Sequence, residues 1–294
     1  MIGKIPLHSK ILNVTHYDLD GAGCSILLKY MFDHIDILPA SYADISKILN
    51  KCVNFHAYDY VILTDITPED REKLVQYKDK IVILDHHDTA MDLLDKKENW
   101  FVKEDFCATV LTKKYLEYQY KEDLSVFNFL TYIVNDYDMW IHDTPRSTFI
   151  NELFWKYHFD NFVKRFKSGN TKIYEEELQY LKRRKSKYEK ILSLLDIYEI
   201  KELNGILIIS EDFINELASK YLKEDYSIVF VINPKNYKLS IRHSIDDLHI
   251  GNLVKSLNLG GGHKFAAGVN STSMDEVENY VELIKNELKQ ILEV

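Results

Sequence analysis

The chain has 294 residues, of which 46% are hydrophobic, and a formal net charge of −9. This length suits one large domain or two moderate ones with ordinary packed cores. An acidic chain is poorly suited to coat long duplex nucleic acid, and no stretch approaches the ~20 apolar residues of a membrane helix. The three cysteines are widely spaced and form no disulfide framework, and the N-terminus lacks the apolar core of a signal peptide. We therefore expect a soluble, cytoplasmic protein.

The first half of the chain alternates short apolar runs with helical patterns, which predicts a parallel sheet with helices on both faces. Strands are expected at residues 11–15, 60–64 and 81–84. Helices are expected at residues 22–33, after Pro68, at 107–120 and at 124–136. Thr67, followed three residues later by Asp70, resembles a capping box at the start of the second helix.

Residues 171–196 form a long, charged helical stretch that we interpret as a connector between domains. A second alternating set follows, with strands expected at 205–209, 227–232 and 239–242 and helices at 248–257 and 274–292. The predicted fold is therefore α/β with two domains. A parallel-sheet domain takes residues 1–150, a helical linker residues 151–196, and a smaller α/β domain residues 197–294.

Titratable side chains follow the first predicted strand at every second position: His16, Asp18 and Asp20. Alternate residues of an extended segment point the same way, so these three side chains can converge on one site. The alternative is a capped strand–helix turn, where Asp is common. That alternative explains one Asp but not a His and two Asp.

Metal-competent residues also follow the other two strands. Asp65 comes directly after strand 60–64, and Asp85, His86 and His87 come after strand 81–84. The carboxyl ends of strands in open α/β sheets are where ligands bind. Neighbouring histidines on an extended chain point to opposite sides, so one can bind a metal while the other faces a substrate. The alternative is a pair of strand ends that bind nothing.

Asp136 and Asp138 end the helical pattern 124–136, and either one can complete the set. Taken alone, this pair could equally belong to a surface turn. Carboxylates and imidazoles without cysteine suit Mn²⁺, Mg²⁺ or Fe²⁺ better than structural zinc. The number of ligands fits two divalent cations, which can clamp a hydroxide and an in-line phosphoryl transfer.

The second half carries a glycine-rich motif, Gly260, Gly261, Gly262 and His263. Consecutive glycines expose backbone N–H groups and let an anion approach closely, although a flexible loop is the alternative. Arg242, on the predicted strand 239–242, is the candidate phosphate clamp because a guanidinium binds phosphate oxygens in bidentate fashion. The alternative for Arg242 is an ordinary surface arginine.

In this order the motifs resemble the DHH phosphoesterase family, whose C-terminal domain carries the glycine-rich motif, over residues 11–290. The resemblance implies a DHH catalytic domain and a substrate-binding domain with substrate in the cleft between them, and two ions, usually Mn²⁺. By this pattern one ion is held by His16, Asp18 and Asp65. The other is held by Asp20, Asp65, His86 and Asp136, with Asp138 as the competing candidate. His87 would face the scissile phosphate, Asp85 would support the site, and Arg242 and His263 would recognise a phosphate or a terminal nucleotide.

The first motif is most similar to that of the nanoRNase B-type enzymes. We therefore expect Mn²⁺-dependent hydrolysis of short single-stranded oligonucleotides, nanoRNA or short DNA, to mononucleotides by hydroxide attack at two metals. Alternative substrates of the same site are a cyclic or linear dinucleotide and a 3′-phosphoadenosine 5′-phosphate-like nucleotide. The glycine-rich motif argues against a family II-like pyrophosphatase.

An alternative of another class is a non-catalytic nucleotide sensor or decoy. Every expected ligand position is filled, which favours an enzyme. As partners we expect a short oligonucleotide or small nucleotide, no long duplex and no membrane, and the sequence leaves a homodimer open.

Overall fold

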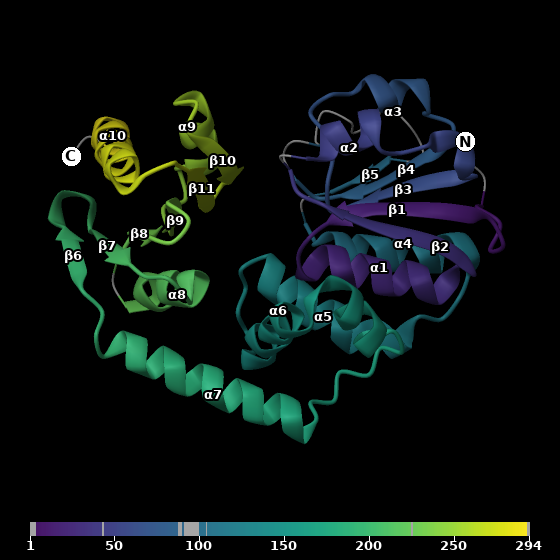
Figure 1. Cartoon of the computed structure of the whole chain (residues 1–294), viewed down its shortest axis with the longest axis horizontal. Coiled ribbons are helices and arrows are strands. Elements are labelled where there is room, and N and C mark those ends of the chain that lie inside the picture. The colour runs from purple at the N-terminus through teal and green to yellow at the C-terminus, as the bar shows by residue number, and fades with distance from the viewer. Residues whose placement is uncertain are drawn as a thin grey trace. The chain divides into compact units, whose positions relative to one another are not determined.

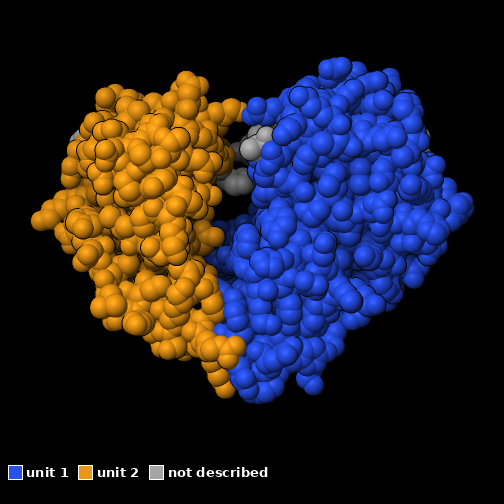
Figure 2. All heavy atoms as spheres, viewed as in Figure 1, with its two compact units in different colours: residues 1–181 blue, residues 182–294 orange. Residues whose placement is uncertain are grey.

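The computed structural model describes residues 4–42, 44–87, 90, 100–103, 105–224 and 226–292, without the side chains of Trp100, Lys223, Glu224 and His263. The chain divides into two compact units, Met1–Leu181 and Lys182–Val294, which Figure 2 draws in different colours. No helix among the described residues is both long and apolar enough to pass through a lipid bilayer.

The first unit is built on a five-stranded parallel sheet in the order β2-β1-β3-β4-β5 (Figure 1). Its strands are β1 (Lys10–His16), β2 (His34–Ala40), β3 (Tyr60–Thr64), β4 (Ile81–Asp85) and β5 (Trp100–Val102). The strands predicted from apolar runs are β1, β3 and β4, and all three are confirmed. The edge strand β2 was not predicted, because it is half exposed and contains Pro39, a residue that sheets tolerate at an edge.

Helices cover both faces of this sheet, as the strand–helix alternation predicts. They are α1 (Leu19–Met31), α2 (Ile45–Lys51), α3 (Glu72–Gln76), α4 (Ala108–Tyr120), α5 (Asn128–Asp138) and α6 (Pro145–Phe166), with short 3₁₀ turns at Phe55–Ala57 and Ser125–Phe127. Alternate residues of β3 enter opposite cores: Ile62 packs with α1, α4, α5 and α6, whereas Val61 and Leu63 pack with α2 and α3. The predicted α/β class is confirmed.

Helix α6 begins inside the residues expected for the first domain and runs into the expected linker. Its side chains Ile150, Phe154 and Phe162 are fully buried or nearly so and pack in the core of the first unit. The division between the two units falls later, inside α7 (Glu175–Leu192). Leu181 of α7 packs in the first core, and Tyr188 packs in a core of the second unit.

The second unit holds a six-stranded mixed sheet in the order β10-β11-β9-β8-β7-β6, in which only β7 and β8 are parallel. Its strands are β6 (Ile197–Ile200), β7 (Gly205–Ile209), β8 (Ile228–Asn233), β9 (Lys238–His243), β10 (Gly260–His263) and β11 (Ala266–Asn270). Helix α8 (Ile214–Glu224) packs on one face, and α9 (Ile250–Ser256) and α10 (Met274–Leu292) pack on the other. A 3₁₀ turn spans Lys201–Leu203.

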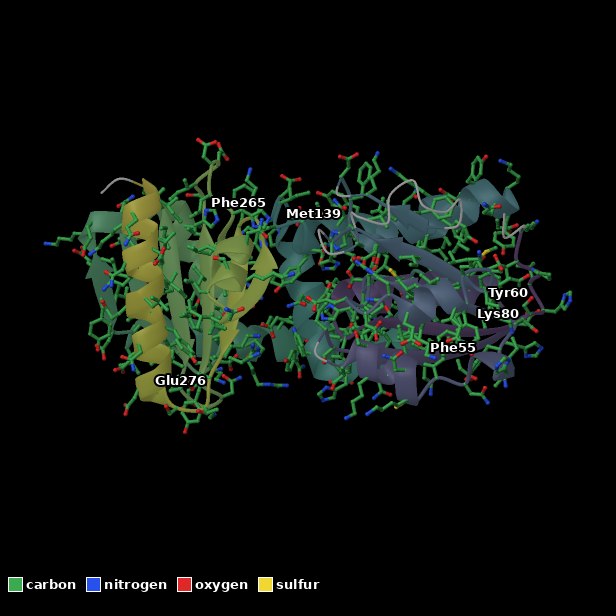
Figure 3. All side chains as sticks on the ribbon, turned by 90° about the horizontal axis from the view of Figure 1, so that it is seen from above. Phe55, Tyr60, Lys80, Met139, Phe265 and Glu276 are labelled. Atoms are coloured by element: carbon green, nitrogen blue, oxygen red, sulfur yellow. The ribbon has the colours of Figure 1, made fainter. Side chains whose placement is uncertain are left out.

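The structure differs from the loop alternative for the glycine-rich motif and from one local prediction. The glycine-rich motif forms strand β10 and not a loop. Thr67 does not cap a helix: α3 begins at Glu72 after Arg71, and the Thr67 hydroxyl donates to Asp85 instead. Tyr60 and Lys80, labelled in Figure 3, mark the amino ends of β3 and β4, and the candidate site lies after the carboxyl ends of these strands.

Candidate metal centre

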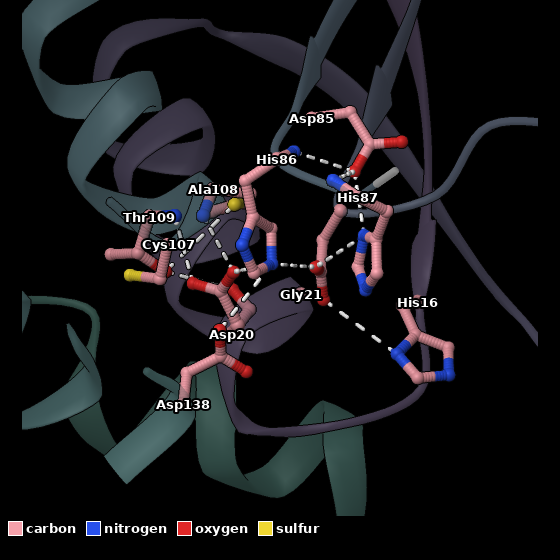
Figure 4. Close-up of polar contacts among 12 residues, drawn as sticks. His16, Asp20, Gly21, Asp85, His86, His87, Cys107, Ala108, Thr109 and Asp138 are labelled. Atoms are coloured by element: carbon pink, nitrogen blue, oxygen red, sulfur yellow. Dashed lines mark hydrogen bonds and ion pairs between the residues drawn. The ribbon is translucent and has the colours of Figure 1, made fainter. Parts of the chain in front are cut away.

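The three motifs after β1, β3 and β4 meet at one edge of the first unit's sheet. Parallel pairing places the carboxyl ends of these strands at the same edge. Groups of three residues that could hold a metal ion form there (Figure 4). Within each group, the ligand atoms of the three residues all lie within 4.8 Å of one another. The groups are His16 with Asp18 and Asp65, Asp65 with His86 and His87, and Asp20 with His86 and Asp138.

Asp65 is the centre of this arrangement. Its carboxylate oxygens lie 3.7 Å from His16 Nδ1, 3.3 Å from His86 Nε2 and 3.7 Å from His87 Nδ1. Both oxygens are buried, and neither accepts a hydrogen bond from the described residues. The backbone of Asp65 has φ 58°, a strained left-handed conformation that often marks functional sites.

The electrostatics of Asp65 favour a bound cation. Burial, followed by the charges of Asp18 and Asp20, raises the pKa of Asp65 well above its usual value. Three carboxylates therefore crowd one desolvated point, where like charges repel strongly. A divalent cation at this point would remove the repulsion and complete the coordination of the Asp65 oxygens.

His16 and Asp18 form a close pair at one side of Asp65. His16 Nδ1 lies 2.8 Å from Asp18 Oδ2, and Asp18 also caps α1 by accepting a hydrogen bond from Gly21 N at 2.9 Å. Burial alone would lower the pKa of His16, but the charge and hydrogen bond of Asp18 outweigh it and raise this pKa to about 11. The same pairing holds the pKa of Asp18 below its usual value, against the effect of burial.

Asp20, His86 and Asp138 form the group on the other side. His86 Nε2 lies 3.7 Å from Asp20 Oδ2 and 3.3 Å from Asp138 Oδ2. The Asp20 carboxylate is also fixed by the amino end of α4, where Ala108 N and Thr109 N donate to it at 2.6 and 2.8 Å. Burial, followed by the charge of Asp20, raises the pKa of Asp138 to about 8.

Among the described residues, Asp138 and not Asp136 lies with Asp20 and His86, so the geometry favours Asp138, the competing candidate, over Asp136 for the last position. Asp136 Oδ1 accepts a hydrogen bond from Asp143 N at 2.8 Å, and Oδ2 accepts one from Thr144 N at 3.4 Å. Asp136 and Asp138 are two residues apart on a helix, which turns by about 200° over that distance, so the two carboxylates face different ways. Asp136 folds the loop after α5, and Asp138 points to the other motifs.

Asp85 organises the two histidines that follow it. Its Oδ1 accepts hydrogen bonds from His86 N at 2.8 Å and His87 N at 3.3 Å, and lies 2.7 Å from His87 Nδ1. Thr67 donates to Oδ2. Burial alone would raise the pKa of Asp85, but His87 and these donors hold it below its usual range. Asp85 therefore stays ionised and fixes the orientation of His87.

Tyr42, in the segment between β2 and α2, belongs to the site although no motif pointed to it. Its ring centroid lies 4.8 Å from that of His16 and 5.2 Å from that of His87. A single tyrosine among 20, outside any regular pattern, carries no local signal that sequence reasoning can use.

In the second unit, β10, β11 and β9 bring the glycines and Arg242 onto one sheet. Gly260 and Gly262 have structural reasons to be glycine, because a side chain would collide with the carbonyls of Gly268 and Ala266. A side chain on Gly261 would meet only open space. Gly261 therefore has no packing reason to be glycine, which favours access for a ligand.

Arg242 lies on the face of the sheet that carries Gly261, because cross-strand partners point to the same side. One of its terminal nitrogens donates to Asn215 Oδ1 at 2.9 Å, and the other donates to Ile241 O at 2.9 Å. The side chain of His263 lies outside the described residues, so its predicted role stays a prediction.

Two family models match the chain: the "DHH family, N-terminal domain" over residues 10–137 and the "DHHA1 domain" over residues 207–290. Oligoribonuclease NrnB of Bacillus subtilis (strain 168) is 26% identical over 297 residues, covering 90% of this chain and 73% of the relative.

Two solved structures share the fold. The pGpG-specific phosphodiesterase PggH of Vibrio cholerae has a TM-score of 0.57 at 15% identity, covering 96% of this chain and 99% of that chain. RecJ of Thermus thermophilus, in complex with Mn²⁺, has a TM-score of 0.58 at 13% identity, covering 96% of this chain but 52% of that chain. At such low identity these two structures support the two-domain architecture alone.

Proposed function

Because this chain belongs to the DHH family of phosphoesterases, we propose that it hydrolyses short single-stranded oligonucleotides to mononucleotides with two divalent cations, preferably Mn²⁺. The observation that carries the proposal is the buried Asp65 carboxylate, which three strand-end motifs surround and to which no described residue donates a hydrogen bond. A buried carboxylate without donors is costly unless a cation neutralises it.

The donor set fits two hard divalent cations. His16, Asp18 and Asp65 would hold one, and Asp20, Asp65, His86 and Asp138 would hold the other, with Asp65 shared. Carboxylate oxygens with a few imidazoles match Mn²⁺ and Mg²⁺, and RecJ, which has the same fold, has been solved in complex with each of these two ions. Such ions would supply Lewis-acid stabilisation of the scissile phosphate and activation of water.

His87 would act on the substrate while Asp85 holds it in place. The 2.7 Å contact between Asp85 and His87 Nδ1 favours the tautomer with its proton on Nδ1. Proton exchange with the leaving oxygen would then fall to Nε2, and an ionised Asp85 would stabilise the imidazolium. Asp85 is thus a positioning residue, whereas His87 touches the reacting group.

The open face of the second unit suits the phosphate and base of a nucleotide. Gly261, where a side chain would meet only open space, pairs with Gly268, which lies under the end of the Lys238 side chain and pairs in turn with Ser240 on β9. Lys238 and Arg242 lie two residues to either side of Ser240 and supply positive charge. Small residues between cations admit a planar base and an anion together.

A small substrate agrees with the charge of the protein and with its relative. The formal net charge of −9 disfavours long polyanions, which are held through many basic contacts. The Bacillus subtilis relative is named an oligoribonuclease and aligns with 90% of this chain. We therefore place the substrate among short oligonucleotides.

A panel assay tests this function. Metal-depleted protein with added Mn²⁺ would be offered 2- to 10-residue RNA and DNA, cyclic dinucleotides, 3′-phosphoadenosine 5′-phosphate and pyrophosphate. We expect the shortest linear oligonucleotides to be hydrolysed fastest. Preference for a cyclic dinucleotide, for 3′-phosphoadenosine 5′-phosphate or for pyrophosphate would contradict the proposal.

Two variants make the assay specific to the proposed centre. Asp65→Asn removes the shared ligand and should abolish turnover, because a neutral amide cannot balance two cations. Asp79→Asn is the matched control, since Asp79 precedes β4 at the opposite end of the sheet. Equal loss of turnover in both variants would show that the assay reports folding and not the site.

A further inference from the structure

We propose that Tyr42 is a catalytic residue whose hydroxyl donates a hydrogen bond to the phosphate under attack, while its ring holds two imidazoles of the site in place. This inference rests on the proposed function, because the phosphate is taken to lie at the centre around Asp65. The proposal adds a neutral donor from the segment after β2 to a site otherwise built from the ends of β1, β3, β4 and α5 and the start of α1.

The position of the ring is the first observation. Tyr42 contacts His16, which ends β1, and His87, which follows β4, at centroid separations of 4.8 and 5.2 Å. These two strands are not neighbours, since β3 lies between them. The ring therefore lies across the carboxyl end of β3 and touches both sides of the site.

The hydroxyl is the second observation. It lies 3.4 Å from the backbone carbonyl of Asp65, the residue at the centre of the cluster. This separation is longer than an ordinary O–H···O hydrogen bond of about 2.7 Å, so the contact holds the hydroxyl weakly. A donor that is close to the site and weakly held can turn to a stronger acceptor such as a phosphate oxygen.

The third observation is the exposure of Tyr42 and the hydrogen bonds beside it. Tyr42 is 41% exposed, whereas Asp65, Asp20 and Asp85 are fully buried. Beside Tyr42, Ser41 Oγ donates to Asp44 Oδ2 at 2.7 Å, and Asp44 N donates to Ser41 O at 3.1 Å. Tyr42 is thus a partly exposed residue of the site that a substrate can reach.

The ring and the hydroxyl make separable contributions. The ring makes a tilted contact with His16 and an edge contact with His87, both of which phenylalanine would preserve. The hydroxyl donates a proton that phenylalanine lacks. Charge on the phosphate oxygens rises or redistributes in phosphoryl transfer, and a positioned donor stabilises it.

The test compares Tyr42→Phe and Tyr42→Ala with Tyr30→Phe, a control on α1 whose tyrosine has a similar exposure of 50%. The assays are kcat and KM on a linear dinucleotide, calorimetric binding of inorganic phosphate to the Mn²⁺-loaded protein, and Mn²⁺ binding to the metal-free protein. For Tyr42→Phe we expect kcat/KM to fall about tenfold and phosphate binding to weaken severalfold, with Mn²⁺ affinity unchanged. Tyr42→Ala should lose further activity because the imidazoles also lose their packing.

The proposal is overturned if Tyr42→Phe binds phosphate and turns over like the wild type, because the residue would then act by packing alone. An equal loss of Mn²⁺ affinity in Tyr42→Phe would also overturn it, since the effect would pass through the metal ligands. Failure of the proposed function looks different: the wild type would cleave no oligonucleotide, and the phosphate calorimetry would still decide whether Tyr42 binds phosphate.

Discussion

The two neighbouring carboxylates at the end of α5 should respond in opposite ways to the same substitution. We expect Asp138→Asn to stabilise the metal-free protein and to weaken Mn²⁺ binding by about tenfold or more. We expect Asp136→Asn to destabilise the protein and to leave Mn²⁺ binding unchanged. The reason is that Asp138 faces other carboxylates, whereas Asp136 accepts backbone hydrogen bonds.

The size of the effect at Asp138 follows from its pKa. Burial and Asp20 raise this pKa to about 8 in the metal-free fold. In the unfolded chain the carboxyl of Asp138 ionises near pH 4. Its contribution to the free energy of unfolding is therefore full below pH 4 and is lost as the pH rises toward 8. At about 1.4 kcal/mol per unit, the loss by pH 7 is at most about 4 kcal/mol. Asparagine removes the ionisation but stays a buried polar group, so we expect a gain of about 2 kcal/mol.

At Asp136 the sign is reversed. Asparagine keeps one acceptor oxygen but loses the charge that strengthens the bond from Asp143 N at 2.8 Å. We expect a loss of about 1 kcal/mol in the free energy of unfolding.

Urea unfolding of both metal-free variants at pH 5 and pH 7 would measure these changes, with calorimetric Mn²⁺ titrations alongside. The gain from Asp138→Asn should be larger at pH 7 than at pH 5. The reasoning is refuted if both variants shift stability in the same direction, or if Asp136→Asn is the one that loses Mn²⁺.

Three further predictions concern the rest of the molecule. Glu177→Ala should lower the free energy of unfolding by about 3 kcal/mol in urea titrations, because it removes the buried carboxylate that accepts from Arg165 at 2.8 Å, from the Tyr157 hydroxyl and from Tyr174 N. Burial lowers the pKa of His243, so its own contribution to stability is full above pH 6.5 and is lost as the pH drops below it; a stability difference between the wild type and His243→Asn that stays constant from pH 7.5 to 5.5 would contradict this. Gly261→Ala should fold normally but raise KM, which steady-state kinetics would measure. Gly262→Ala should lose about 1 kcal/mol or more of stability in melting curves, because its methyl group would collide with a backbone carbonyl of β11.

The buried strands of the first sheet were predictable because burial on both faces makes a strand a continuous apolar run. Val61, Ile62 and Leu63 of β3 are all fully buried and enter two different cores. The edge strand β2 lacks such a run, since solvent reaches part of it and Pro39 interrupts its pattern. Strand β10 could not be predicted for another reason: its three glycines have no side chains whose alternation would indicate a strand.

The candidate site was predictable where ligands end a strand and uncertain where they end a helix. Asp65 and His86 are placed by the register of parallel strands, which sequence patterns capture. Asp136 and Asp138 face different ways on α5, but the sequence does not say which way the helix is turned toward the metal centre. Tyr42 was not predictable at all, because its place depends on how the segment after β2 folds back over the sheet edge.

Asp20 belongs to the candidate metal centre and also accepts hydrogen bonds from two backbone amides, so these amides can report on a cation bound at the centre. Ala108 N and Thr109 N donate to the same carboxylate that lies 3.7 Å from His86. A cation that draws electron density from Asp20 would weaken these two hydrogen bonds, and the shift of an amide proton is sensitive to such a change. Nuclear magnetic resonance of the first turn of α4 in isotope-labelled protein, with diamagnetic Mg²⁺ as the titrant, would therefore follow occupancy of the centre without a substrate or a substitution.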